Sequence, residues 1–148
     1  MSELSLSAAS LIVDKALERG RELALAPLTV VVLDAGGHLK AAKREDGSSL
    51  LRPEIAMGKA WGVLGMGFGG RELARRAARA PQFFAALATL AEGRMVAVPG
   101  GVLIRSADGA IVGAVGISGD VSEKDEDCAV HGIAAARLVA DTGGEETR

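Results

Sequence analysis

The sequence contains a single cysteine, Cys128, so no disulfide can form within the chain, and this usage suits a reducing compartment. It contains no apolar run near the about 18 residues that a membrane-spanning helix needs. A basic leader with a cleavable apolar core is also missing, which predicts a cytoplasmic protein. Aromatic residues are scarce, so the core is expected to consist of Ala, Val, Leu and Ile. The aromatic residues are Trp61, Phe68, Phe83 and Phe84.

An excess of charge of one sign is absent as well. The chain has 17 Lys and Arg against 19 Asp and Glu, a net charge of −2, and no basic stripe. This balance predicts neither a nucleic-acid partner nor a membrane partner. A chain of 148 residues fits one domain with its own core. We therefore expect a single domain over residues 1–148, with an ordered core at about 7–141.

The hydrophobic periodicity predicts an α+β domain with antiparallel strands and flanking helices. Helices are expected over 7–24 with Ser7 as the N-cap, over 53–66, from 71 to a break at Pro81, from Pro81 onward, and over 122–141. Strands are expected over 28–34, 38–44, 94–101, 101–106 and 110–119. In short form the predicted order is α-β-β-α-α-β-β-β-α.

Glycines mark two segments. In the apolar helix predicted over 53–66, Glu54, Gly58, Gly62 and Gly65 fall on one narrow stripe at 100° per residue. Each such glycine costs about 1 kcal/mol relative to alanine. The stripe therefore predicts close packing against the sheet or a second subunit, or else a platform for a flat ligand. The glycines of "VPGGVLIRSADGAIVGAVGISG" are interpreted as turns, because the segment lacks the G-x-x-x-x-G-K-[ST] pattern of a phosphate loop.

The stretch "DEDCAVHG", residues 125–132, concentrates acids, the cysteine and a histidine near the start of the last predicted helix. Ser122 and Asp125 have the spacing of a capping box, and acids in the first turn complement the helix dipole. On a helical projection Asp125 lies on the face directed toward the sheet, whereas Glu126 points the opposite way. This pattern alone indicates a capped helix start.

The same stretch allows two further interpretations. Asp127 and His131, four residues apart on a helix, are placed to converge on a metal ion, although two such ligands do not complete a site. Cys128 and His131, three residues apart, form a candidate nucleophile and base, yet a cysteine facing a sheet is usually inert packing. His38, the other histidine, begins a strand after a glycine turn, where it is either exposed to water or at the mouth of a pocket.

Four sequence blocks resemble the GlcG/HbpS family of haem-binding or haem-degrading-type domains, whose fold also forms the C-terminal domain of PduO-type proteins. The blocks are "VVLDAGGHLKAAKREDGSS", "EIAMGKAW", "VPGGVLIRSADGAIVGAVGISGD" and "DEDCAVHGIAAARL". The resemblance covers roughly residues 11–138. It implies a profilin-like fold, in which helices flank a central antiparallel sheet, and assembly into homodimers or larger homo-oligomers.

The resemblance also implies binding of haem or a related tetrapyrrole, in a protein accessory to a catabolic or redox-stress pathway. His38 or His131 would be the axial ligand of the haem iron, and Arg44, Arg52 or Lys59 would pair with the propionates. The residues expected to contact the ligand are His38, Arg44, Arg52, Glu54, Lys59, Trp61, Gly100, Gly101, Asp125 and His131.

An enzyme of small-molecule catabolism is the alternative hypothesis. Its pocket would lie near Pro99, Gly100 and Gly101, between the glycine-rich helix and the start of the last helix. Glu54, Asp125 or Glu126 would act as acid or base there, with His131 as a further candidate, while turn amides polarise a carbonyl. A third hypothesis is an oligomer-forming accessory protein without a small ligand, in which the glycine stripe serves subunit contact.

Overall fold

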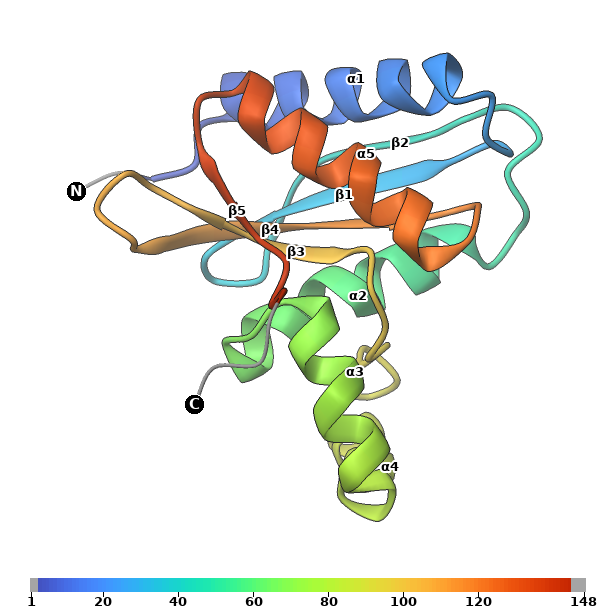
Figure 1. Cartoon of the computed structure of the whole chain (residues 1–148), viewed down its shortest axis with the longest axis vertical. Helices are drawn as coiled ribbons and strands as arrows, with labels where there is room; N and C mark the ends of the chain where they lie inside the picture. Colours follow the sequence, from blue (N-terminus) through green and yellow to red (C-terminus); the bar gives the residue numbers. More distant parts are fainter. Residues whose placement is uncertain (1–2, 145–148) are drawn as a thin grey trace.

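A five-stranded antiparallel sheet forms the centre of the computed structural model, which describes residues 3–144 (Figure 1). The strand order is β2-β1-β4-β3-β5, and each neighbouring pair is antiparallel. This arrangement confirms the predicted α+β fold with helices flanking an antiparallel sheet. The strands are β1 (Thr29–Asp34), β2 (Leu39–Arg44), β3 (Gly101–Arg105), β4 (Ile111–Ser118) and β5 (Val139–Asp141).

Helices cover both faces of the sheet and bury a separate apolar cluster on each (Figure 1). On one face lie α1 (Leu6–Glu22) and α5 (Ser122–Ala135), which also pack against each other. On the other face lies α2 (Arg52–Met66). The two clusters are built mainly from Ala, Val, Leu and Ile, as the scarcity of aromatic residues predicts.

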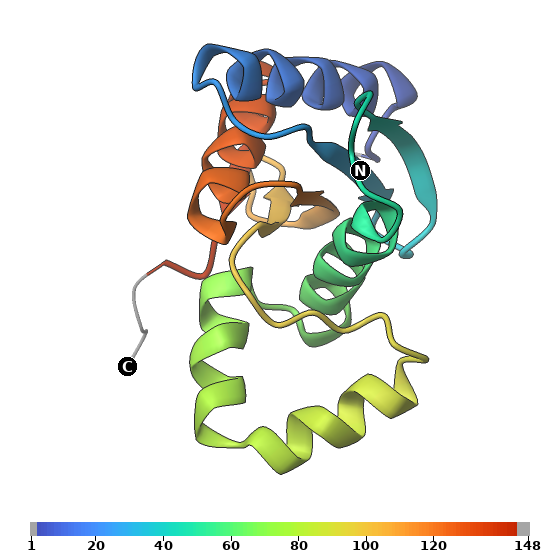
Figure 2. The ribbon, with the colours of Figure 1, turned by 90° about the vertical axis from the view of Figure 1, so that its right-hand side faces the viewer.

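Two short helices, α3 (Gly70–Arg79) and α4 (Pro81–Leu90), project from the α2 side as an arm (Figures 1 and 2). Pro81 separates them, as predicted, because proline starts a helix well but cannot continue one. Phe84 is the buried residue of α4 and joins the apolar cluster beneath the sheet. Residues 3–144 contain no helix that is both long and apolar enough to cross a membrane.

Several predicted boundaries are wrong. The N-cap of α1 is Ser5, whose Oγ accepts a hydrogen bond from the Ala8 amide at 3.0 Å, and not Ser7. The last helix ends at Ala135 instead of 141, because Arg137 adopts a left-handed φ of 61°. The chain then forms β5, which pairs with β3 and which the sequence pattern does not predict.

The segment 94–101 is not a strand up to Gly101. It crosses α2, and the Val96 amide donates to the Gly58 carbonyl at 3.2 Å instead of joining the sheet. A Cβ atom at Gly58 would lie 2.7 Å from Val96 Cγ2, and one at Gly62 would lie 3.0 Å from Met95 Sδ. The first part of the glycine stripe therefore allows close packing of the protein's own chain, whereas a Cβ atom at Gly65 would meet nothing within 4 Å.

Candidate functional site

The cavity beside His131 lies where α1, α3 and α5 meet and has a volume of about 570 Å³. His131 is exposed on α5, one turn beyond Asp127 on the same helix. The cavity thus combines an accessible imidazole with charged groups from three helices. Its lining residues are Arg19, Arg71, Glu123, Glu126, Asp127, Val130, His131 and Ala134.

The two arginines of this cavity are held by carboxylates of α5. Arg19 Nε donates to Asp127 Oδ1 at 3.0 Å, and Arg71 forms a fork with Glu126 at 2.7–3.0 Å. Hydrogen bonding to Asp127 raises the pKa of Arg19, and hydrogen bonding to Glu126 raises the pKa of Arg71. Both guanidinium groups therefore stay charged and fixed in direction at the cavity wall.

Glu126 was predicted to point opposite to the sheet-facing side of α5, and its side chain there is nevertheless buried, only 8% exposed. The reason is α3, which carries Arg71 across that flank of α5. A projection of one helix does not show that another helix covers its outer side.

The His38 cavity is the second one that contains a histidine, with a volume of about 400 Å³. It lies between the β1–β2 turn and the β3–β4 turn, which are at the same end of the sheet (Figure 1). Asp34 Oδ1 accepts hydrogen bonds from the Gly36 and His38 amides at 2.9 and 3.0 Å, and the His38 amide lowers the pKa of Asp34. The His38 ring is exposed, 3.5 Å from the same oxygen. Lys40 is the cation among the lining residues.

Lys59 and Asp125 form a buried ion pair at 3.1 Å, with side chains 4% and 1% exposed. The ammonium also donates to the Ile117 carbonyl at 2.8 Å, and Asp125 Oδ1 accepts the Asp120 amide at 3.1 Å. Burial lowers the pKa of Lys59 and raises that of Asp125, each against the attraction of its partner. The pair links α2, β4 and α5 inside the protein.

The turn predicted to border an enzyme pocket lies directly against this pair. A Cβ atom at Gly100 would be 2.8 Å from Lys59 Nζ, and one at Gly101 would be 2.5 Å from the Lys59 carbonyl oxygen. The Lys59 side chain therefore occupies the place where an enzyme pocket was expected. Glu54 is exposed at the start of α2 and does not line the His131 cavity, to which Glu126 belongs.

The remaining predicted contact residues are engaged elsewhere. Arg52 Nη1 donates to Ser118 Oγ at 3.0 Å, beside the end of β4. The Trp61 ring lies 3.9 Å from the guanidinium carbon of Arg94 and covers Gly37 of the β1–β2 turn. The structure therefore does not gather the predicted ligand contacts into one cavity.

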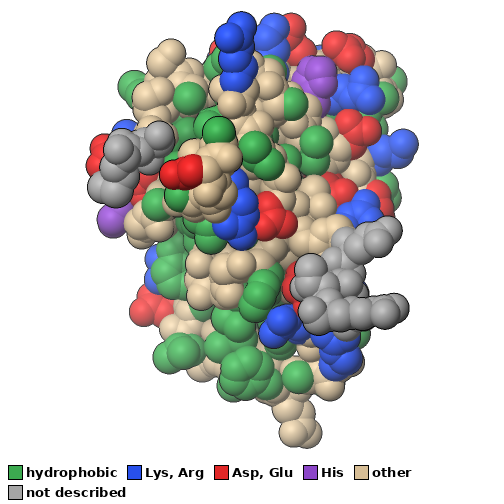
Figure 3. Space-filling view, turned by 60° about the vertical axis from the view of Figure 1, so that its left-hand side comes forward, with side chains coloured by type: hydrophobic (Ala, Val, Ile, Leu, Met, Phe, Trp, Pro, Cys, Tyr) green, Lys and Arg blue, Asp and Glu red, His purple; other side chains and the backbone are tan. Residues whose placement is uncertain are grey.

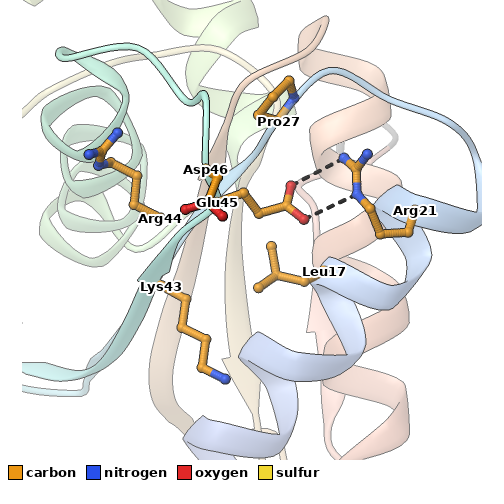
Figure 4. Close-up of a pocket in the computed structure, with 7 residues that line it drawn as sticks. All are labelled: Leu17, Arg21, Pro27, Lys43, Arg44, Glu45 and Asp46. Atoms are coloured by element: carbon orange, nitrogen blue, oxygen red, sulfur yellow. Dashed lines mark hydrogen bonds and ion pairs between the residues drawn. The ribbon is translucent and has the colours of Figure 1, made fainter.

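Arg44 lines a shallow depression of about 510 Å³ between α1 and β2 (Figure 4). Its Nη1 donates to the Ser48 carbonyl at 2.6 Å, and in Figure 4 the side chain points away from Arg21. Arg21 and Glu45 form an ion pair across the depression at 3.1 Å, and Glu45 also accepts the Leu28 amide. No histidine is among the lining residues, so this depression offers charge pairing without a ligand for iron.

The structure supports neither the metal site at Asp127 and His131 nor the cysteine nucleophile at Cys128. Cys128 is buried against the sheet, and burial raises the pKa of its thiol to about 12, so it is not an activated nucleophile. In residues 3–144 no group of three or more His, Cys, Asp and Glu side chains is placed to hold a metal ion. Asp127 instead binds Arg19.

Arg19 and Arg71 are the cavity residues that sequence reasoning missed. They precede His131 by 112 and 60 residues in the sequence, and the packing of α1 on α5 and the ion pair between Arg71 and Glu126 bring them to it. The available signal was the charge pattern of α3, "GRELARRAAR", where four arginines accompany one acid. Such an excess predicts that some arginines bind acids of another element or of a ligand.

Comparisons with known proteins agree with the family resemblance. The model of the family described as "Haem degrading protein HbpS-like" matches residues 4–134. The corrinoid adenosyltransferase PduO of Salmonella typhimurium is 32% identical over 123 residues, which are 83% of this chain and 36% of that protein. The chain thus spans about a third of the length of this curated relative.

Two solved structures share both the fold and part of the sequence. A PduOC:haem complex has 30% identity and a TM-score of 0.82, covering 93% of this chain and 97% of that one. HbpS has 28% identity and a TM-score of 0.77, covering 90% of each chain. These likenesses extend over nine-tenths or more of the chain.

Proposed function

This chain belongs to the HbpS-like family, and from that membership we propose that it binds haem or a closely related tetrapyrrole. The observation that carries the proposal is the likeness to the PduOC:haem complex, at 30% identity over 93% of the chain. A relative of this similarity that holds haem makes a tetrapyrrole the ligand class that fits best. The chemistry of the candidate cavities then decides where such a ligand would bind.

Of the two histidine cavities, the one beside His131 fits haem better. Haem carries an iron that takes imidazole and two propionates that suit guanidinium groups. The His131 cavity, of about 570 Å³, supplies one imidazole and two arginines, which are bound in part by two of the three carboxylates that also line it. The His38 cavity is smaller and offers a single cation, Lys40. We therefore assign His131 as the iron ligand and the arginines as the propionate partners.

The residues of this chain would act as follows. The exposed His131 imidazole offers a nitrogen to the iron, and bound haem would supply the redox or gas-binding chemistry. Val130 and Ala134 provide apolar contact on the same helix. Each arginine has five N–H donors, of which its carboxylate partners use only part, so donors remain for a propionate.

Haemin titration followed in the Soret region tests this assignment. We expect a saturable spectral change with the wild-type protein and a rise in Kd of about tenfold or more in His131→Ala, because the iron ligand is lost. His38→Ala is the matched control and should bind like wild type. Loss of binding in His38→Ala alone would move the site to the other cavity. No saturable change in the wild-type protein would refute haem binding.

We also propose that the chain self-associates through α4, the outer helix of the α3–α4 arm. Helix α4 has no charged residue, and Phe83 and Leu90 are 56% and 81% exposed. Figure 3 shows hydrophobic side chains gathered over the lower part of the molecule, where Figure 1 places this arm. A second copy fits this surface, because a two-fold contact between uncharged helices brings no like charges together.

Sedimentation velocity at micromolar concentration would test this contact. The wild-type protein is expected to sediment as a dimer or a larger oligomer, and Leu90→Glu should shift it toward the monomer, since burying a carboxylate without a partner is costly. Leu50→Glu is the control, because Leu50 is as exposed as Leu90 but lies outside the arm. A monomeric wild-type protein, or equal effects of both variants, would contradict the proposal.

A further inference from the structure

We infer that the His131 cavity selects tetrapyrroles by their free carboxylates, with Arg71 as the specificity-determining residue and Glu126 as the residue that positions it. This inference rests on the proposed tetrapyrrole binding and goes beyond it by naming which members of the class are bound. It predicts a preference for porphyrins with ionised propionates over their esters and over corrinoids, whose side chains end in amides.

The fork between Arg71 and Glu126 fixes the direction of one guanidinium group. Arg71 Nε lies 2.8 and 3.0 Å from the two Glu126 oxygens, and Nη2 lies 2.7 Å from Oε1. A guanidinium is planar with five N–H donors, so the fork occupies one edge and leaves the Nη1 side for another acceptor. The Arg71 side chain is 44% exposed where it lines the cavity.

Both ends of this arrangement are anchored. Glu126 is buried at the side-chain level, 8% exposed, so its carboxylate cannot easily follow a moving arginine. The Arg71 amide donates to the Thr142 carbonyl at 2.9 Å, which holds the start of α3 against the chain that follows β5. The free edge of Arg71 is therefore presented in a fixed direction before any ligand arrives, which lowers the entropic cost of binding.

Arg19 gives the cavity a second, looser guanidinium. Its Nε donates to Asp127 and its Nη1 to Glu22, at 3.0 and 3.3 Å. Three acids, Glu123, Glu126 and Asp127, line the cavity with the two arginines, so a ligand carboxylate meets directed N–H donors and no positive field. Recognition then depends on the acceptor: an ionised carboxylate accepts two parallel hydrogen bonds, and an ester or amide accepts fewer and weaker ones.

The experiment compares haemin, haemin dimethyl ester and cobalamin as ligands of the same protein, with Kd measured by absorbance. The wild-type protein is expected to bind haemin at least about tenfold more tightly than the diester, the size of one charge-assisted hydrogen bond. Cobalamin should give no saturable change. Arg71→Gln and Glu126→Gln should each reduce the haemin-to-diester ratio toward one while leaving the Kd for the diester nearly unchanged.

Two further variants keep the result interpretable. Lys124→Gln removes an exposed cation of α5 that does not line the cavity, and it should retain the wild-type ratio. Arg71→Lys keeps the charge but not the fork, so its ratio should fall between those of wild type and Arg71→Gln. If circular dichroism shows that Glu126→Gln does not fold, Arg71→Lys still tests the role of the fork.

The outcomes separate this inference from the proposal on which it rests. If the wild-type protein binds neither haemin nor its diester, tetrapyrrole binding itself is refuted. If it binds both equally, or binds cobalamin as tightly as haemin, tetrapyrrole binding stands and carboxylate selection is refuted. If the preference survives in Arg71→Gln, the assignment to Arg71 is overturned.

Discussion

Replacing Lys59 by methionine is expected to lower the free energy of unfolding by about 3–5 kcal/mol, the usual cost of leaving one partner of a buried ion pair alone. Asp125 is 1% exposed in its side chain and would lose its cationic partner at 3.1 Å. The Ile117 carbonyl would also lose the donor that now binds it at 2.8 Å. Methionine fills a volume similar to that of lysine, so the change reports on charge rather than on a cavity.

Urea unfolding followed by circular dichroism measures this difference. Lys43→Met is the matched control, because Lys43 pairs with Asp14 at 2.7 Å on the surface, where such pairs contribute about 1 kcal/mol or less. The double variant Lys59→Met, Asp125→Leu should regain most of the stability, since no buried charge is left unpaired. Equal losses in Lys59→Met and Lys43→Met would show that the buried pair does not link α2 to α5 as described.

Half of this ion pair could be predicted from sequence. The helical projection correctly placed Asp125 on the buried face of α5. Its partner lies 66 residues earlier, and no local pattern connects the two. A signal was nevertheless present: Lys59 stands in the otherwise apolar stretch "AMGKAWG", and a lysine buried there requires a carboxylate partner. Pairing it with an acid on another buried helix face would have found Asp125.

The elements that depend on the local sequence pattern were predicted correctly. Those that depend on hydrogen bonding to a distant part of the chain were missed. Strands β1, β2 and β4 follow from β-branched runs and turns, and the break at Pro81 follows from proline chemistry. Strand β5 is only three residues long and forms by pairing with the edge of β3. It was not predicted, because the helical periodicity of the sequence continues through these residues. The segment 94–98 has strand-like residues but is bound to α2 through its backbone.

The candidate site shows the same division. His131 was singled out from a short stretch of sequence, because its neighbours and its position on a helix could be read locally. Arg19 and Arg71 belong to α1 and α3, and their approach to His131 depends on the packing of α1 on α5 and on the long-range ion pair between Arg71 and Glu126. The propionate partners predicted instead, Lys59 among them, were chosen for charge alone, which does not tell a buried cation from one at a cavity wall.

Gly116→Ala is expected to destabilise the protein by about 3 kcal/mol or more, the upper range for overpacking a core. A Cβ atom at Gly116 would lie 1.9 Å from the Ala56 carbonyl oxygen of α2. Gly116 is paired with Gly101 across β3 and β4, so two adjacent glycines form the floor on which α2 rests. These glycines were interpreted as turns, yet Gly116 lies inside β4, and its role there is to admit a helix backbone.

Gly65→Ala supplies the opposite case on α2 itself. Gly65 lies within the helix, and a Cβ atom there meets nothing within 4 Å, so alanine should stabilise the protein by up to about 1 kcal/mol through helix propensity. Urea unfolding of the two variants distinguishes steric overlap with a neighbouring backbone from a general effect of replacing glycine by alanine. If Gly116→Ala unfolds at the wild-type midpoint, α2 does not sit on the sheet as closely as described. A loss of stability in Gly116→Ala together with a gain in Gly65→Ala would show that glycine is required at position 116 because the α2 backbone lies where a side chain would be, and that position 65 has no such requirement.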